Sequence, residues 1–422
     1  MKTNSFLMTN KLWFLLLFNI GLLLRITFLY ISPNKALEGD EIFYSETAMN
    51  VANGIGIFGH NYISFWPPLY SCFLGILYKI SSNYYFIGLM QSLLNLFSCF
   101  ILFLIGRKIF NNLNMFFLIS FFIFYPEMIK QPSEFLSEDL FIFLFLTSLY
   151  FIYVYVENLK TFYGIIAGIL IGLSSLTREI ALYFIPFLFI WMFFIIQKDK
   201  KNKNEVLKRF LIIFLSTILT IFPWTLRNYF IFREIVPIST NIGVNLLIGN
   251  NPNATGEFMP VKINCPKPKS FRDVPLSVVA SMEYDLNRIA SEQALDFIKS
   301  NPLSYIKLCF KRLFLFWSPP VRNINIDNFD SETLFRIIWL LCYLIVLFTG
   351  FMGIIFSIKE KNKKAFLIIL IFFYYTGIHM LTVSTIRYRL PLIPLLMIFS
   401  NFALIKVIPK LTIKKIFIHN HA

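Results

Sequence analysis

The feature that most constrains the fold of this chain is a series of long, uninterrupted apolar stretches. A helix needs about 20 residues to cross the hydrocarbon core of a bilayer, which is roughly 30 Å thick. Stretches 12–30, 84–106, 210–232, 334–356 and 390–408 each approach or exceed that length. Only 15% of the residues are charged, whereas a soluble domain usually has about 25%. The sequence therefore predicts an all-α polytopic membrane protein.

We expect about ten transmembrane helices, several of them short. Their predicted bounds are 12–31, 84–106, 115–127, 138–156, 162–177, 180–196, 210–230, 334–356, 365–383 and 390–408. The chain then divides into a membrane-embedded module of about seven spans (1–232), an extracytoplasmic segment (233–333) and C-terminal helices with a basic tail (334–422). The first apolar run lacks a small-residue cleavage site, so we interpret it as a retained span and not as a signal peptide.

The net charge of +16 is unevenly distributed along the chain. With the N-terminus inside, the alternation of ten spans places the dense basic runs on the inner side, as the positive-inside rule requires. We therefore expect both termini in the cytoplasm and the chain in the plasma (inner) membrane, surrounded by membrane lipids. The basic balance does not indicate nucleic-acid binding. The basic runs are "RKIF", "QKDKKNKNEVLKR", "SIKEKNKK" and "PKLTIKK".

Two predicted outer regions are long. The first, 32–83, contains "LYSCFLGILYKI", which is too short to span and predicts a juxtamembrane helix at the outer interface. The second, 231–333, begins with a half rich in Asn, Gly and Pro, a composition that predicts turns. Residues 276–300 then have a helical period, and "NPLSYIKLCFKRLFLFW" predicts an amphipathic helix that returns to the membrane.

Isolated ionisable residues gather on the predicted outer side, although such groups are costly near a bilayer. A carboxylate there can take a proton from an incoming hydroxyl, and arginines can hold a leaving phosphate through forked hydrogen bonds. Together these groups predict a site for transfer from a phosphate ester. The residues are Asp40, Glu41, Glu134, Glu138, Asp139, Arg178, Glu179, Arg387 and Arg389, with Arg25 and Arg227 near the outer ends of apolar runs.

Each of these residues also has an ordinary structural interpretation. Asp40 and Glu41 suit the first turn of a helix that begins near Gly39, where acids complement the helix dipole. Glu134 and Glu138 are four residues apart and would share one face of a helix. A lone arginine at a helix end usually reaches to the lipid headgroups. The convergence of the residues on one side favours the functional interpretation.

The five cysteines show no spacing typical of a metal site. Cys265 and Cys309 both lie near or within the predicted outer segment, where an oxidising compartment would allow them to pair. The sequence alone leaves that pairing open.

The order of several short motifs resembles the GT-C superfamily of membrane glycosyltransferases, which use polyprenyl-phosphate-linked sugars. The closest resemblance is to the bacterial branch related to dolichyl-phosphate-mannose–protein mannosyltransferases, which includes the aminoarabinose transferase acting on lipid A. The motifs reach from Arg25 to about Leu396. They are "GDEIFYSETA" with "PPLY" after it, "LTREIALYFIP", "FPWTLRNYFIF", "VPISTNIGVNLLIGNNPNATG", "NPLSYIKLCFKRLFLFWSP" and "RYRLPLIPLL".

The resemblance implies roles for particular residues. The catalytic acid of the first outer loop corresponds to Asp40, with Glu41 as its neighbour, and Asp40 is expected to act as general base. The resemblance implies that three arginines bind the donor phosphate: Arg178, Arg387 and Arg389. The expected further substrate-binding residues are Tyr44, Glu134, Glu138, Tyr388 and Arg25.

The function implied is inverting transfer of a sugar from a polyprenyl-phosphate-linked donor to a lipid, glycan or protein acceptor on the outer face. The outer loops lack the acidic D-x-D pair of the metal-dependent oligosaccharyltransferases, so no cofactor is expected, and a divalent metal stays open. The alternatives are a transporter or flippase, or a polymerase or ligase, for lipid-linked saccharides. Transporters place polar groups near the midplane of paired halves, which this sequence does not show.

Overall fold

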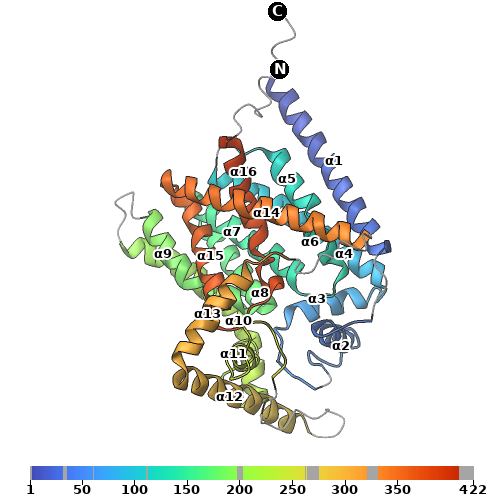
Figure 1. The fold of residues 1–422 in the computed structure, drawn as a ribbon, viewed down its shortest axis with the longest axis vertical. Coiled ribbons are helices and arrows are strands. Elements are labelled where there is room, and N and C mark those ends of the chain that lie inside the picture. The colour runs from blue at the N-terminus through green and yellow to red at the C-terminus, as the bar shows by residue number, and fades with distance from the viewer. Residues whose placement is uncertain are drawn as a thin grey trace, which may run out of the picture.

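The computed structural model describes residues 2–31, 36–59, 61–110, 113–196, 203–261, 263, 275–320 and 331–407. Within these ranges every regular element is helical (Figure 1), which confirms the predicted all-α polytopic fold. The longer helices are α1 (Lys2–Ile31), α2 (Asp40–Ala52), α3 (Leu69–Tyr78), α4 (Tyr84–Ile109), α5 (Met115–Phe124), α7 (Glu138–Asn158), α8 (Thr161–Thr177), α9 (Ile185–Ile196), α10 (Lys203–Phe232), α11 (Ile242–Gly249), α12 (Leu276–Ser300), α13 (Pro302–Phe316), α14 (Ser331–Lys359), α15 (Lys363–Leu381) and α16 (Leu392–Val407). Short turns of helix are α6 (Pro126–Lys130), η1 (Gln131–Ser133), η2 (Glu179–Phe184) and η4 (Ile386–Arg389).

Each of the ten predicted spans coincides with a helix, but not all are long enough to cross a bilayer alone. Six of the described helices have the length and apolar composition of a span: α1, α4, α7, α10, α14 and α15. The other predicted spans are apolar helices of 10 to 17 residues. Helix α5, with 10 residues, rises only about 15 Å. It ends at Phe124, and the next residue, Tyr125, is extended because a proline, here Pro126, disfavours helical backbone in the residue before it.

Burial separates the central helices from the peripheral ones. The apolar window of α7 is 72% buried inside the protein, whereas those of α1 and α14 are each 22% buried. Buried Leu, Ile and Phe side chains of α4, α7, α15 and α16 form one large core. The exposed apolar faces of α1 and α14 are those expected of helices that contact lipid.

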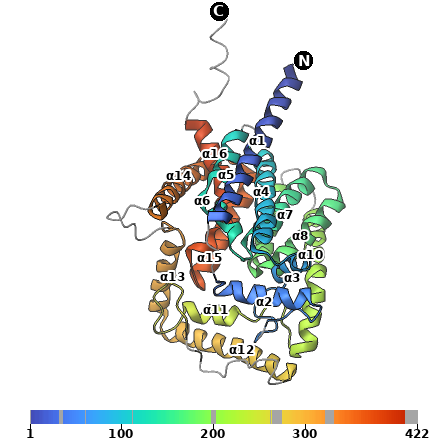
Figure 2. The same ribbon diagram turned by 90° about the vertical axis from the view of Figure 1, so that its right-hand side faces the viewer.

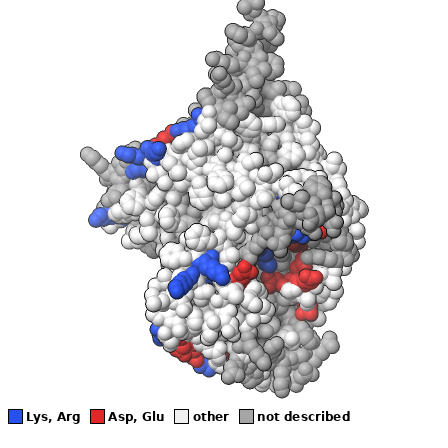
Figure 3. All heavy atoms as spheres, in the orientation of Figure 1, with Lys and Arg blue, Asp and Glu red and all other residues white. Residues whose placement is uncertain are grey.

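Segments that the sequence places on the same side come together in space. Glu157 pairs with both Lys108 (2.5 Å) and Lys364 (2.6 Å), so three predicted inner segments meet. Helices α2, α3, α11 and α12 lie at the opposite end of the molecule, away from the start of α1 (Figures 1 and 2). On the face drawn in Figure 3, charged side chains gather at the upper left and in the lower half, with a largely uncharged zone between them.

The juxtamembrane helices follow the sequence pattern in all but one case. Helices α3, α12 and α13 occupy the predicted stretches. Helix α11, however, occupies residues 242–249, where turns were expected, so that expectation was wrong for these residues. Turns and bends do occur within residues 250–257. The apolar Leu247 of α11 packs against Ala290 and Ala294 of α12, and Gly243 donates its N–H to Asn287 of the same helix (2.7 Å). Packing on a neighbouring helix stabilises this short helix, and local composition does not reveal such a contact.

Candidate active site

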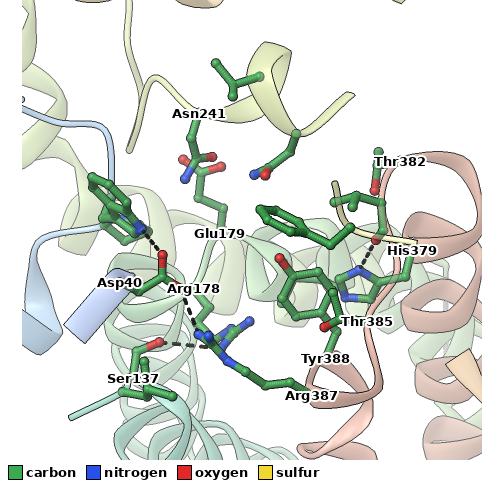
Figure 4. A pocket seen from close by; sticks show the side chains of 18 of the residues that line it. Asp40, Ser137, Arg178, Glu179, Asn241, His379, Thr382, Thr385, Arg387 and Tyr388 are labelled. Atoms are coloured by element: carbon green, nitrogen blue, oxygen red, sulfur yellow. Dashed lines mark hydrogen bonds and ion pairs between the residues drawn. The ribbon is translucent and has the colours of Figure 1, made fainter. Parts of the chain in front are cut away.

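A cavity of about 1050 Å³ opens at the end of the molecule that carries α2 and α11. Its walls come from segments far apart in the sequence: the start of α2, the loop before α3, the segment before α7, η2, α11 and the region between α15 and α16 (Figure 4). All of these were predicted to lie on the outer side. The cavity therefore brings Asp40, Arg178 and Arg387 together, as the sequence predicts.

Three charged side chains form the floor of the cavity, Asp40, Arg178 and Arg387, and Glu138 is buried beneath them without bordering the cavity. Glu138, fully buried at the start of α7, accepts from Arg178 Nη1 at 2.7 Å and from Arg387 Nε through the same oxygen. Arg387 Nη2 also pairs with Asp40 Oδ2 at 3.1 Å. A buried carboxylate is costly unless it is paired, so Glu138 holds the two guanidiniums side by side under the cavity.

Both arginines of the floor remain charged. Burial opposes the charge of Arg387, but the neighbouring Glu138 and Asp40 outweigh it and raise the pKa of this guanidinium. Arg178 behaves alike: burial acts against its charge, and Glu138 raises its pKa above the ordinary value. Among the described residues, Arg178 Nη2 and Arg387 Nη1 have no hydrogen-bond partner. These spare donors point to a site that can accept anionic oxygens.

Asp40 fits both interpretations that the sequence allows, as a first-turn acid of a helix and as a site carboxylate. It is the first residue of α2, after Gly39 with a φ of 55°, a left-handed conformation that glycine adopts without strain. Its carboxylate accepts from Trp66 Nε1 at 3.2 Å and pairs with Arg387. About one third of the side chain, 35%, stays exposed. Asp40 thus complements the helix dipole and still presents a carboxylate to the cavity.

Glu41 has a different environment, although it is adjacent to Asp40 and also borders the cavity. It is buried and accepts from the backbone N–H of Phe135 (3.0 Å) and of Glu38 (3.2 Å). These contacts fix the start of α2 against the segment that precedes α7. Tyr44, one turn further along α2, is buried at the cavity wall, and burial together with Asp40 raises the pKa of its hydroxyl.

Glu134 borders the cavity but does not share a helix face with Glu138, so that expectation was wrong. Glu134 is extended, with φ −102° and ψ 136°, because the chain breaks between η1 and α7. It pairs with Lys130 at 2.8 Å. Tyr388 lies in the wall with its ring 5.7 Å from the Arg178 guanidinium.

Three of the predicted arginines lie outside the cavity: Arg389, Arg25 and Arg227. Arg227 donates to Ser64 Oγ (2.7 Å) and to the carbonyl of Ile57 (3.0 Å). Arg389 is fully buried, donates to the carbonyl oxygens of Phe316 (2.8 Å) and Ser318, and covers the ring of Tyr343 at 4.1 Å. It joins the end of α13 to α14, although it is only two residues from Arg387. The structure therefore gives Arg389 no contact with the other predicted phosphate-binding residues.

Arg25 is the second of these arginines. It is fully buried in α1 and donates to Asn95 Oδ1 (2.8 and 3.1 Å) and to the carbonyl of Gly21 (3.0 Å). Asn95 in turn donates to Asp139 at 2.6 Å. This network joins α1, α4 and α7 within the bundle, so the structure gives Arg25 a packing environment and no contact with the cavity.

Several cavity residues were not assigned to the site from sequence. Glu179, which the sequence analysis already places among the ionisable residues of the outer side, borders the cavity. Asn241 and Asn245 were missed because turns were expected around α11. His379 stacks on Tyr388 with ring centroids 4.7 Å apart and hydrogen-bonds the carbonyl of Val383 through Nδ1. His379 lies near the end of the apolar helix α15, and no pattern in the sequence around it indicates a place in the site.

A second buried carboxylate supports two walls of the cavity. Glu283 of α12 accepts from the N–H of Ile63 (2.5 Å) and Ser64 (3.0 Å) and from the hydroxyl of Thr240 (2.5 Å). One of these segments continues into Trp66, and α11 follows the other. The Glu283 contacts thus tie both walls to α12.

Cys265, one member of the possible disulfide, lies outside the described residues, and Cys309 is a buried free thiol. Within the described part of the chain, no group of three or more His, Cys, Asp or Glu side chains has an arrangement suited to a metal ion.

A model of a known protein family matches part of this chain. Residues 66–224 match the model of the family described as dolichyl-phosphate-mannose-protein mannosyltransferase. The predicted resemblance is confirmed. The matched segment begins at Trp66 in the cavity wall and includes Glu138 and Arg178.

Two solved structures of an archaeal oligosaccharyltransferase are similar in fold to this chain. The archaeal oligosaccharyltransferase AglB of Archaeoglobus fulgidus, in complex with an inhibitory peptide and a dolichol-phosphate, has a TM-score of 0.57 at 12% identity over 95% of this chain and 51% of that one. The apo form of the A. fulgidus oligosaccharyltransferase gives 0.59 at 14% identity over 96% and 51%. The chain thus spans about half the length of these proteins. ArnT from Cupriavidus metallidurans, bound to undecaprenyl phosphate, gives 0.39 at 13% identity over 92% and 77%. No curated protein sequence matches.

Proposed function

We propose that the protein is a glycosyltransferase that moves a sugar from a polyprenyl-phosphate-linked donor to an acceptor hydroxyl on the outer face of the plasma membrane. The observation that carries this proposal is the floor of the cavity, where Asp40, Arg178 and Arg387 converge around Glu138. The matched family is named for a dolichyl-phosphate-linked sugar, and AglB was solved with a dolichol-phosphate. Both support a lipid-linked donor.

The proposed reaction is a single displacement with inversion. The acceptor oxygen attacks the anomeric carbon of the donor, and the bond from that carbon to the phosphate oxygen breaks. Asp40 takes the proton of the acceptor hydroxyl, because its carboxylate is partly exposed to the cavity beside Arg387. The oxygens of the departing phosphate accept hydrogen bonds from the spare N–H groups of Arg178 and Arg387. Preplaced donors of this kind are usually the largest contribution to such catalysis.

We propose the orientation from the positive-inside rule. The cavity lies outside, and the end that carries Glu157, Lys108 and Lys364 faces the cytoplasm together with both termini. Module 1–232 supplies Asp40, Glu138 and Arg178, segment 233–333 covers the acceptor side, and the C-terminal part 334–422 supplies Arg387.

The test is the variant Asp40→Asn in protein reconstituted with radiolabelled undecaprenyl-phosphate sugars and bacterial membrane acceptors. Loss of a general base lowers transfer by about 10²-fold or more. The matched control is Glu46→Gln, because Glu46 is an exposed acid of the same helix outside the cavity. Full transfer by Asp40→Asn would overturn the role of Asp40. Movement of label across vesicles without new glycosidic bonds would overturn the enzyme and favour a transporter.

A further inference from the structure

The cavity has two chemically different parts. The floor carries Arg178 and Arg387, whereas the opposite wall carries Glu179, Asn241 and Asn245. In Figure 4 the side chains of Glu179 and Asn241 point toward one another on the side of the cavity away from the guanidiniums. Ser239, two residues before Asn241, lies close enough to interact with the Glu179 carboxylate. This second part is the Glu179 wall.

The two parts also differ in charge. Both arginines that border the cavity lie at its floor, where the negative charges of Glu138 and Asp40 balance their positive charges. No lysine or arginine among the described residues borders the Glu179 wall. Among the described residues, five acids and two arginines border the cavity. The acids that border the cavity are Glu38, Asp40, Glu41, Glu134 and Glu179. The cavity can therefore hold one phosphate at its floor but repels a second anion at the wall.

We propose that the Glu179 wall is the acceptor subsite and that it takes an uncharged, hydroxyl-rich sugar of a glycan and not an anionic group. This inference rests on the proposed function, because it assigns the donor phosphate to the arginine floor. The charge of the wall restricts the chemical class of the acceptor. A phosphate or carboxylate bound there would face the Glu179 carboxylate, which forms no ion pair with a described lysine or arginine.

The side chains of the wall suit such an acceptor. A carboxylate accepts hydrogen bonds from hydroxyls, and a carboxamide both donates and accepts, so Glu179 and the two asparagines can bind adjacent hydroxyls of one ring. Aromatic side chains border the same space: Phe258, 49% exposed, and Trp66, whose N–H contacts Asp40. The C–H face of a sugar packs on such rings. An acceptor on this wall places its hydroxyl between Glu179 and Asp40.

The experiment uses the full chain in lipid nanodiscs, fluorescently labelled and applied to an array of neutral, phosphorylated and sulfated glycans. Neutral glycans are expected to bind, and phosphorylated and sulfated ones are not. Glu179→Gln removes a charged acceptor and lowers the neutral signal about tenfold or more. Asn245→Ala, which leaves η2 unchanged, is expected to lower it as well. Glu46→Gln is the control and keeps the full signal.

A parallel measurement of undecaprenyl phosphate binding separates the two proposals. If undecaprenyl phosphate binds in an Arg387-dependent manner but neutral glycans do not, or if phosphorylated glycans bind better, the acceptor subsite is wrong and the proposed function stands. If undecaprenyl phosphate itself fails to bind, the proposed function is wrong. A loss of both ligands in Glu179→Gln would show a structural role for Glu179 and would also overturn the subsite.

Discussion

Two buried carboxylates at the same end of the molecule, Glu138 and Glu283, are stabilised in different ways. Both are fully excluded from solvent. Glu138 is held by the guanidiniums of Arg178 and Arg387, of which Arg387 is 33% exposed and has a spare N–H. Glu283 is held by two backbone N–H groups and the hydroxyl of Thr240.

The difference shows which of the two regions can react. The donors around Glu283 are used up by that carboxylate, so the region fixes chain segments in place and offers nothing to a ligand. The donors around Glu138 belong to guanidiniums that keep a spare N–H group each, and an incoming anion can accept hydrogen bonds from these groups. Burial of an acid therefore does not identify the site. The site is identified by partners of the acid that are charged and still have unused hydrogen-bond donors.

The largest expected effect is that of Glu138→Gln. The change leaves Arg178 and Arg387 close together with only Asp40 to balance them, and breaking a buried pair costs about 3–5 kcal/mol. Thermal unfolding in nanodiscs measures the loss. Glu157→Gln is the control, since its pairs with Lys108 and Lys364 are partly exposed and such pairs contribute about 1 kcal/mol or less. Equal, small losses in both variants would contradict the special role of the floor.

The next effect is on ligand binding and concerns Arg387→Ala. Removal of a charged donor is expected to weaken undecaprenyl phosphate binding by about 1.5–3 kcal/mol, or roughly 10- to 100-fold. Arg288→Ala is the control, because Arg288 is a surface arginine of α12 that pairs only with Asp285 and Glu292 among the described residues. Unchanged binding in Arg387→Ala would place the phosphate elsewhere.

The sequence predicts the fold well because apolar length and basic runs are local signals. The stretch 276–300, with its helical period, is α12 to the residue, and each predicted span is a helix. Helix α11 escaped prediction because its stability comes from contact with α12. The lengths of α5 and α9 also escaped prediction, since Pro126 and η2 interrupt the apolar stretches.

The site is predicted in part. The alternation of the predicted spans places Asp40, Arg178 and Arg387 on the same side of the membrane, and in the structure all three border one cavity. The alternation gives the side of a residue but not the direction of its side chain. Arg387 and Arg389 are two residues apart in a short turn of helix, η4, and point to different partners. Their neighbours in space, Glu138 and Phe316, are each more than 70 residues away in the sequence.

A smaller effect is expected from Glu283→Gln. The carboxamide offers one acceptor oxygen and one NH2 group to three donors, so one donor is left unsatisfied at a cost of about 1–3 kcal/mol. Thermal stability is expected to fall, while undecaprenyl phosphate binding at permissive temperature is unchanged. Asp285→Asn, an exposed change on the same helix, is the control. A specific loss of phosphate binding in Glu283→Gln would make the two regions functionally alike.

The smallest effect, none at all, is expected from pH on undecaprenyl phosphate binding between about pH 7.5 and 9.5, where the phosphate stays fully ionised. Glu138 outweighs burial and raises the pKa of both Arg178 and Arg387. A basic group is charged at every pH below its pKa. The ordinary pKa of arginine is about 12.5 or higher, so a raised pKa keeps both guanidiniums charged up to at least that pH. The cations of the floor therefore do not titrate in this range. Binding measured at steps across it should be constant, and a decline would mean that a group with a lower pKa than these guanidiniums holds the phosphate.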